Sequence, residues 1–321
     1  MAKIFITRRL PEEGIKMLEE HELEIYEGDV PPSKEEIIEG VRGKDALICL
    51  LTDKIDGEVM DSSPNLKIIA NYAVGIDNID LEEANKRGIV VTNTPGVLTE
   101  TVADLTWALM MSISRRIVEG DEFMRKGKFK GWAPLLMLGG DVYGKTLGII
   151  GAGRIGKAVA KRAKGFNMKI IYYSRKRKKE MEEIGADFVD LPTLLKESDF
   201  VSLHIPLTKE TYHLIGEKEF KMMKSSAYLI NTARGKCIDE GALVKALKEG
   251  WIRGAALDVF ENEPHVMPEL KELKNVVITP HIGSASYETR SKMAVMVAEN
   301  VLAALNGKMP PNCVNPDAWK K

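Results

Sequence analysis

A glycine-rich turn between an apolar strand and a helix, near the middle of the chain, constrains the fold more than any other feature. The strand Leu147–Ile150 runs into Gly151-x-Gly153-x-x-Gly156, and a helical stretch and a second strand ending at Ser174 follow. Gly151 allows a tight turn, Gly153 lets the backbone approach a pyrophosphate, and Gly156 lets helix and strand pack closely. The N–H groups at the start of the helix then face the anion. This context predicts a dinucleotide-binding βαβ unit.

The second strand of that unit ends in a basic segment, SRKRKK at 174–179, where an NAD-binding protein usually carries an acidic residue for the ribose 2′-hydroxyl. A carboxylate would repel a 2′-phosphate, whereas a hydroxyl and a guanidinium would bind it. We therefore expect Ser174, Arg175 and Arg177 to favour NADP(H), with NAD(H) as a second cofactor. A solvated basic loop with no ligand is the alternative interpretation.

Length and composition suit a chain of about two domains with ample core. Its 321 residues are 44% hydrophobic and 29% charged with a net charge of −1, so nothing indicates nucleic acid or a membrane as a partner. The start of the chain does not resemble a signal peptide, and Cys49, Cys237 and Cys313 form no metal-ligand spacing. We expect a reducing cytoplasm and no metal. The absence of Gln beside abundant Lys and Glu indicates a heat-adapted source.

Short apolar runs alternate with helical stretches along the whole chain and predict two doubly wound, mostly parallel sheets. A long helix is expected at about 98–117, and a closing helix near 287–305 should return to the first domain. The predicted layout is a Rossmann nucleotide domain, residues 99–285, inserted into a discontinuous flavodoxin-like substrate domain, residues 1–98 and 286–321.

Three polar residues follow later strands of the nucleotide domain: Arg234 in NTARG, Glu263 in FENEP and His281 in TPHIG. Ligands of open α/β sheets bind beyond the carboxyl ends of the strands, so the three should converge. An Arg fork holds a carboxylate, a His donates a proton to a carbonyl oxygen, and a Glu stabilises the charged imidazole. Singly, each residue could serve a cap or a turn; together they predict a hydride-transfer site.

The segments GIIGAGRIGKAVAKR, NTARGK, AALDVFENEP and TPHIGSAS, with NYAVGIDNID upstream, resemble the D-isomer-specific 2-hydroxyacid dehydrogenase family over essentially the whole chain. The similarity is closest to the glyoxylate/hydroxypyruvate reductase branch. The resemblance implies that Arg234 binds the substrate carboxylate, that Glu263 is the partner of His281, and that His281 is the acid/base. It also implies that Val74 and Gly75 offer backbone N–H groups to the substrate.

The resemblance further implies cofactor contacts, a substrate pocket and an assembly. The cofactor residues that it and the glycine turn predict, beyond those already named, are Arg154, Ile155, His204, Pro206, Thr211, Thr232, Ala233, Asp258 and Gly283. Leu50 and Trp132 are expected to shape the pocket. Family members are usually homodimers, with the 98–117 helix and the following loop at the interface, and Trp132 stands where similar reductases carry a Trp that reaches the partner's site. A capping aromatic without a substrate role is the alternative for Trp132.

The expected function is NADPH-dependent reduction of small 2-oxoacids, such as glyoxylate and hydroxypyruvate, to 2-hydroxyacids. Two alternatives stay open. One is an NAD-dependent dehydrogenase of the D-lactate or D-3-phosphoglycerate type, against which Ser174 and Arg175 argue. The other is a nucleotide-sensing corepressor of the same fold, which would retain the three polar residues without turnover.

Overall fold

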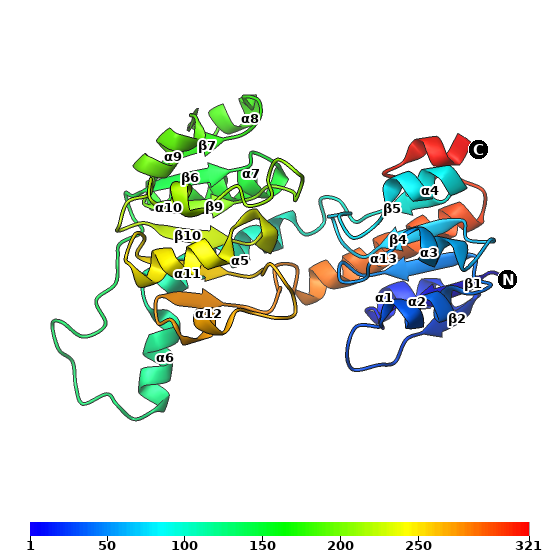
Figure 1. The fold of residues 1–321 in the computed structure, drawn as a ribbon, viewed down its shortest axis with the longest axis horizontal. Helices are drawn as coiled ribbons and strands as arrows, with labels where there is room; N and C mark the ends of the chain where they lie inside the picture. Colours follow the sequence, from blue (N-terminus) through cyan, green and yellow to red (C-terminus); the bar gives the residue numbers. More distant parts are fainter. Residues whose placement is uncertain (321) are drawn as a thin grey trace. The chain divides into compact units, whose positions relative to one another are not determined.

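The computed structural model describes residues 1–320 and divides the chain into two compact units (Figure 1). The first unit consists of Met1–Leu98 and the chain from Ser284 onward, and the second is Thr99–Gly283. Each unit is built on its own parallel sheet, which confirms the predicted α/β class. Within residues 1–320, no helix has the length and apolar character needed to cross a bilayer.

The first unit holds five parallel strands with helices on both faces. In spatial order they are β2 (Glu22–Ile25), β1 (Lys3–Ile6), β3 (Ala46–Cys49), β4 (Ile68–Asn71) and β5 (Val90–Thr92). Successive side chains of a strand point to opposite faces, so Ile4 and Ile6 enter one core layer and Phe5 the other. The first layer lies under α1 (Glu12–Met17) and α13 (Tyr287–Leu305), and the second under α2 (Lys34–Val41), α3 (Gly57–Asp61) and α4 (Leu81–Arg87).

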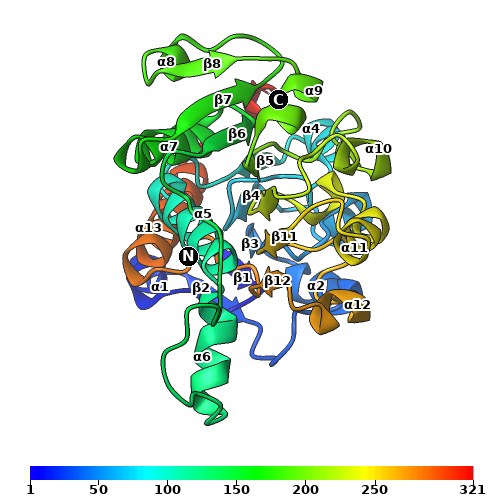
Figure 2. The same cartoon turned by 90° about the vertical axis from the view of Figure 1, so that its left-hand side faces the viewer.

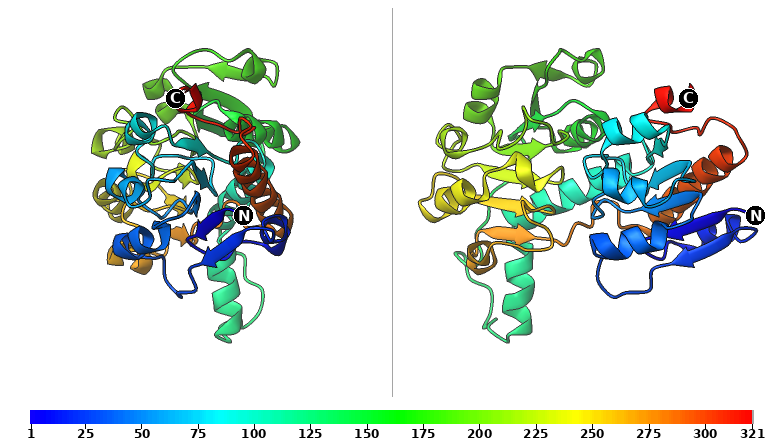
Figure 3. Two further views of the ribbon diagram at one scale, coloured as in Figure 1. Left: turned by 90° about the vertical axis from the view of Figure 1, so that its right-hand side faces the viewer. Right: turned by 45° about the vertical axis from the view of Figure 1, so that its right-hand side comes forward.

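The closing helix α13 is an integral part of the first unit, and Figure 3 shows it running along the sheet. It packs against α1 at Gly14, where an added Cβ would lie 2.6 Å from the carbonyl oxygen of Ala294. No side chain fits at that distance, so the contact requires glycine. The last helix of the chain therefore completes a core that the first residues begin.

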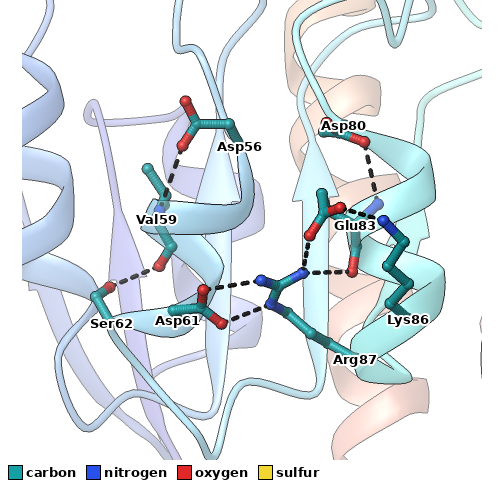
Figure 4. A network of polar contacts seen from close by, with 8 residues as sticks. All are labelled: Asp56, Val59, Asp61, Ser62, Asp80, Glu83, Lys86 and Arg87. Atoms are coloured by element: carbon teal, nitrogen blue, oxygen red, sulfur yellow. Dashed lines mark hydrogen bonds and ion pairs between the residues drawn. The ribbon is translucent and has the colours of Figure 1, made fainter.

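On the opposite face, Arg87 ties α4 to α3 (Figure 4). Its Nε and Nη2 donate to the two carboxylate oxygens of Asp61 at 2.7 and 2.8 Å, and its Nη1 donates to the carboxylate of Glu83. Both helices begin at a capping aspartate, Asp56 for α3 and Asp80 for α4. Because a bidentate fork fixes geometry as well as charge, this network sets the position of α4 on α3.

The second unit holds seven parallel strands. In spatial order they are β12 (Val276–Ile278), β11 (Gly254–Leu257), β10 (Tyr228–Asn231), β9 (Phe200–Leu203), β6 (Thr146–Ile150), β7 (Lys169–Tyr173) and β8 (Ala186–Phe188). Figure 2 shows α5 (Thr99–Ser114) and α7 (Arg154–Ala163) on one face, and α10 (Glu217–Phe220), α11 (Glu240–Lys248) and α12 (Pro268–Glu272) on the other. The chain leaves β6 in one direction for β7 and β8 and returns to β9 on its other side, which is the doubly wound order predicted.

The predicted single helix over 98–117 is wrong in its extent. The helix α5 ends at Ser114, Arg116 adopts a left-handed φ of 55°, and a separate helix α6 (Ile117–Arg125) follows. The N–H of Gly140 donates to the Ser114 carbonyl at 2.8 Å, so the returning chain takes the acceptor at the end of α5. Because this contact comes from a distant part of the sequence, the apolar pattern of residues 98–117 does not indicate it. The helix α6 buries none of its residues and extends outward from the unit (Figure 1).

Candidate active site

The glycine turn lies at the carboxyl end of β6, and its three glycines meet different surroundings. Gly151 has a φ of 106°, and a Cβ there would lie 2.3 Å from the carbonyl oxygen of His204. A Cβ on Gly156 would lie 2.1 Å from the carbonyl oxygen of Gly151. The turn packs against the residue that follows β9 and against its own helix, and these two contacts require glycine at 151 and 156.

Gly153 differs, because a Cβ at this position would meet no atom within 4 Å. It is the N-cap residue of α7 and adopts an extended φ of −81° that any residue accepts. The backbone here is neither strained nor crowded, and there is open room beside the residue that caps a ten-residue helix. That room and the positive end of the helix fit a pyrophosphate group.

The basic segment follows β7, at the neighbouring carboxyl end of the sheet. The Ser174 hydroxyl donates to the carbonyl of Lys176 at 2.6 Å, and the Nε of Arg177 donates to Glu182 at 2.8 Å. The guanidinium of Arg175 has no hydrogen bond or ion pair among the described residues, although its charge helps lower the pKa of Glu210 after the larger effect of the Thr208 hydroxyl. Arg177 therefore pairs with Glu182, whereas Arg175 is a cation of this segment that a ligand can engage.

The loop after β9 carries three expected cofactor residues. The Nε2 of His204 pairs with the Ser202 hydroxyl at 2.8 Å, and burial lowers the pKa of His204 to about 3, so the imidazole is neutral. The Thr211 hydroxyl donates to the Pro206 carbonyl and accepts from the N–H of Thr208, both at 2.7 Å. His204 thus packs its backbone on the glycine turn, while Thr211 closes the following turn.

The structure brings Glu263 and His281 together at the carboxyl ends of β11 and β12. The Nδ1 of His281 lies 2.8 Å from the Oε2 of Glu263, and the Oε1 of Glu263 accepts from the N–H of Phe260 at 3.0 Å. Burial raises the pKa of Glu263, but the hydrogen bond and charge of His281, the N–H of Phe260 and the charge of Arg234 outweigh it and leave the pKa lowered. The carboxylate is therefore ionised at neutral pH. The Nε2 of His281 has no hydrogen-bond partner in the part of the chain that the structure describes.

Asp258, which the sequence placed only beside the nicotinamide, holds the loop that carries His281. Its carboxylate accepts hydrogen bonds from the Thr279 hydroxyl at 2.6 Å and from the N–H groups of Ile282 and Gly283, both at 2.8 Å. Three bonds from one side chain fix a loop whose central residue, His281, has a positive φ of 51°. An aspartate after a strand can be recognised in the sequence, but the groups that it binds cannot.

Arg234 follows β10, and Asn231 shapes its loop. The Asn231 amide donates to the carbonyl of Arg234 at 2.9 Å and accepts from the N–H of Ala233 at 3.0 Å. The hydroxyl of Thr232 pairs with that of Thr106 on α5 at 2.9 Å. The charge of Arg234 contributes to the lowered pKa of Glu263. The strand ends thus bring the arginine, the carboxylate and the imidazole to one edge of the sheet.

Sequence reasoning missed a supporting carboxylate behind this edge. Glu240, the first residue of α11, is only 2% exposed, and its Oε1 accepts from the N–H of Glu261 at 2.7 Å. The carboxylate of Glu261 pairs in turn with Nε2 of His213. These contacts anchor the loop that carries Glu263. Their only sequence signal is the pair Asp239-Glu240, which reads as an ordinary helix start.

The remaining expected substrate residues belong to the first unit or to the segment after α6. Leu50, Val74 and Gly75 belong to the first unit, in loops that follow β3 and β4. Trp132 belongs to the segment after α6 and is 85% exposed. The same segment and α6 expose further large apolar side chains, namely Ile117, Val118, Met124, Phe129, Leu135 and Leu138.

Comparison with known proteins gives a consistent result. Residues 107–283 match the family model described as "D-isomer specific 2-hydroxyacid dehydrogenase, NAD binding domain". The chain is 61% identical to a glyoxylate reductase of Thermococcus litoralis, over 98% of this chain and 97% of that protein. Among solved structures, a Thermus thermophilus protein superposes with a TM-score of 0.93 at 48% identity, covering 97% of this chain and 99% of that one. An NADPH-dependent glyoxylate/hydroxypyruvate reductase from Sinorhizobium meliloti, in complex with NADP and malonate, gives 0.87 at 32% identity, covering 99% and 98%.

Proposed function

The chain belongs to the D-isomer-specific 2-hydroxyacid dehydrogenase family, and on that premise we propose that it reduces glyoxylate and hydroxypyruvate to the 2-hydroxyacids with NADPH as the preferred reductant. The paired Glu263 and His281 carry the proposal, because they place an ionised carboxylate on one ring nitrogen and leave the other for a substrate. Oxidation of glycolate is the reverse of the same chemistry.

In this proposal the second unit is the dinucleotide-binding domain. Gly151, Gly153, Arg154, Ile155 and Gly156 would hold the pyrophosphate at the start of α7, where the room at Gly153 fits it. Arg175 would bind the ribose 2′-phosphate, and the Ser174 hydroxyl would exchange the Lys176 carbonyl for a phosphate oxygen; this is the basis for preferring NADPH over NADH. The bound nicotinamide supplies a hydride equivalent to the carbonyl carbon of the substrate.

The chain's own residues bind and protonate the substrate. Arg234 orients the 2-oxoacid by gripping its carboxylate, together with the backbone N–H groups of Val74 and Gly75. The Nε2 of His281 donates its proton to the carbonyl oxygen, so that the product leaves as an alcohol and the imidazole becomes neutral. Glu263 stabilises the protonated ring before that transfer and fixes its orientation through Nδ1.

A substrate panel with both cofactors tests this function. Purified protein is assayed with glyoxylate, hydroxypyruvate, pyruvate and 3-phosphohydroxypyruvate, each with NADPH and with NADH, at neutral pH. We expect the highest kcat/KM with glyoxylate or hydroxypyruvate and NADPH. Dominant turnover of pyruvate or the phosphorylated acid with NADH would identify the NAD-dependent alternative, and no turnover with any pair would favour a corepressor.

We also propose a homodimer in which α6 and the segment after it contact a second copy. The supporting observation is that this outward-extending segment exposes Trp132 and Leu135, at 85% and 80%, beside several other apolar side chains. An apolar surface of this kind on one segment is typical of an interface. Sedimentation equilibrium of the wild type and of a Trp132→Ser, Leu135→Ser variant tests it, and a wild-type monomer at micromolar concentration would overturn it.

A further inference from the structure

The loop after β4 has three consecutive backbone carbonyls that each accept a hydrogen bond. The Ala73 carbonyl accepts from the N–H of Thr94 at 2.9 Å, as the two loops after β4 and β5 run together. The Val74 carbonyl accepts from the side-chain amide of Asn93 at 2.7 Å. The Gly75 carbonyl accepts from the side-chain amide of Asn71 at 2.8 Å.

The first two of these bonds determine where the N–H groups of Val74 and Gly75 point, and the third fixes the peptide that follows them. A trans peptide is planar, and its C=O and N–H lie on opposite sides of the bond. Asn93 therefore directs the N–H of Gly75 away from itself, and Thr94 does the same for the N–H of Val74. Among residues 1–320, neither N–H donates a hydrogen bond to the protein. Two backbone donors are thus oriented and left for an external acceptor.

We propose that Asn93 is a positioning residue for substrate binding, which directs the N–H of Gly75, beside that of Val74, toward the carboxylate of the 2-oxoacid. Asn71 supports it by holding the next peptide of the loop, that of Gly75 and Ile76. This inference rests on the proposed function, in which the N–H groups of Val74 and Gly75 bind that carboxylate. Neither asparagine touches substrate in the proposal, and each acts through the peptide group whose carbonyl it holds.

The surroundings of Asn71 show that its amide is held rigidly. Asn71 is fully buried at the end of β4, and its amide also donates to the Oδ1 of Asn78 at 3.1 Å. The amide of Asn78 donates to the carbonyls of Leu50 and Asp53 at 2.9 and 3.0 Å, so the loop after β3 joins the same network. A buried amide with its partners satisfied has one low-energy orientation, which is what orienting a neighbouring peptide requires.

A backbone anion site has its highest affinity when its donors are fixed before the ligand arrives, because binding then loses no free energy to ordering them. Loss of the Asn93 amide frees the Val74–Gly75 peptide to rotate toward solvent. The substrate must then reorient it, so binding weakens while proton donation by His281 is untouched. A positioning role therefore predicts a rise in KM with little change in kcat.

The test compares Asn93→Ala with Asn315→Ala. Asn315 is buried and anchors the strand that Asn93 follows, since its Oδ1 accepts from the N–H of Val91 at 2.7 Å and its amide donates to the Ile89 carbonyl at 3.0 Å. Asn93 is only partly buried, and both variants remove a side-chain amide that is bonded to the backbone, but only Asn93 holds a carbonyl of the loop after β4. Thermal unfolding measures the structural cost in each.

We expect Asn93→Ala to raise both the KM for glyoxylate and the Kd of oxamate, a dead-end carboxylate analogue, about tenfold, with kcat and the NADPH KM within about twofold. Asn315→Ala should lower the melting temperature and leave KM and oxamate affinity unchanged. Equal effects in the two variants would overturn the inference. If Asn93→Ala does not fold, Asn93→Ser replaces it under the same expectation. A wild-type enzyme that neither reduces glyoxylate nor binds oxamate would instead defeat the proposed function.

Discussion

Replacing Gly153 with alanine separates cofactor binding from folding. The added methyl meets no protein atom within 4 Å, and the φ of −81° and ψ of −169° suit alanine, so the native backbone is unstrained. Alanine gains about 0.4–1 kcal/mol from a less flexible unfolded chain and loses a similar amount as a poor N-cap. We therefore expect the free energy of unfolding to change by less than about 1 kcal/mol.

Cofactor affinity should respond differently, because the methyl enters the room that the pyrophosphate is proposed to occupy. Displacing the phosphate costs at least one charged hydrogen bond, about 1.5–3 kcal/mol, which corresponds to a Kd raised about 10- to 150-fold. Isothermal titration with NADPH, beside thermal unfolding without cofactor, measures both quantities. Affinity should fall while the melting temperature of the free protein stays near that of the wild type.

Two other glycines of the same unit provide the controls. Gly165 also has no atom within 4 Å of an added Cβ, so Gly165→Ala should leave both stability and NADPH affinity unchanged. Gly156→Ala places a Cβ 2.1 Å from the Gly151 carbonyl oxygen and should lower the melting temperature directly. NADPH binding by Gly153→Ala with wild-type affinity, in a protein of wild-type stability, would refute the assignment of this room to the pyrophosphate.

The site supports four further predictions. Arg175→Ala should raise the KM for NADPH at least tenfold and leave that for NADH nearly unchanged, since about 1.5–3 kcal/mol is lost only where the 2′-phosphate is present; equal losses in steady-state assays would show that Arg175 does not read the phosphate. Arg234→Lys keeps the positive charge but loses the two parallel N–H donors of the guanidinium. The kcat/KM for glyoxylate should therefore drop, while the affinity for NADPH measured by titration stays normal. Unimpaired glyoxylate reduction would contradict the assignment. Glu263→Gln removes the charge that stabilises the protonated ring beside the substrate, so kcat for glyoxylate reduction should fall in steady-state assays while NADPH titration is normal; an unchanged kcat would contradict the pairing. Because the pKa of Glu263 is lowered by folding, the stability that its carboxylate contributes is present above its unfolded pKa of about 4.3 and is lost as pH falls below it, which urea unfolding at pH 3 to 7 checks.

Local signals in the sequence were enough to predict most of the fold. Ser33 forms a capping box with Glu36, a pattern readable as S-x-x-E, and α2 begins there. The closing helix was expected near 287–305, and α13 has those bounds. By contrast, α5 ends where Gly140 returns to it, so its early end depends on a distant part of the chain.

The residues of the candidate site likewise divide into those that local signals predict and those that depend on contacts between distant parts of the chain. Arg234, Glu263 and His281 could be found because each follows an apolar strand, and parallel strands align their carboxyl ends. Their supports could not be found, because the bonds of Asp258 to the 279–283 loop and of Asn93 to the Val74 carbonyl join loops that are adjacent only in the folded sheets. Periodicity locates strand ends but does not report which loops meet beyond them.

The sharing of one unit between the two ends of the chain has a consequence for synthesis on the ribosome. The first 98 residues supply all five strands of their sheet, yet α13, which covers one face, is made only after the whole segment from 99 to 283. At about 5–20 residues per second, that delay is about 10 to 40 seconds. During this interval the apolar face formed by Ile4, Ile48 and Ile68 lacks its main cover. The second unit has all of its own strands and helices as soon as residue 283 emerges, so it can fold first. Nascent chains stopped just after residue 283, before α13, are accordingly expected to depend on chaperones more than the finished protein does.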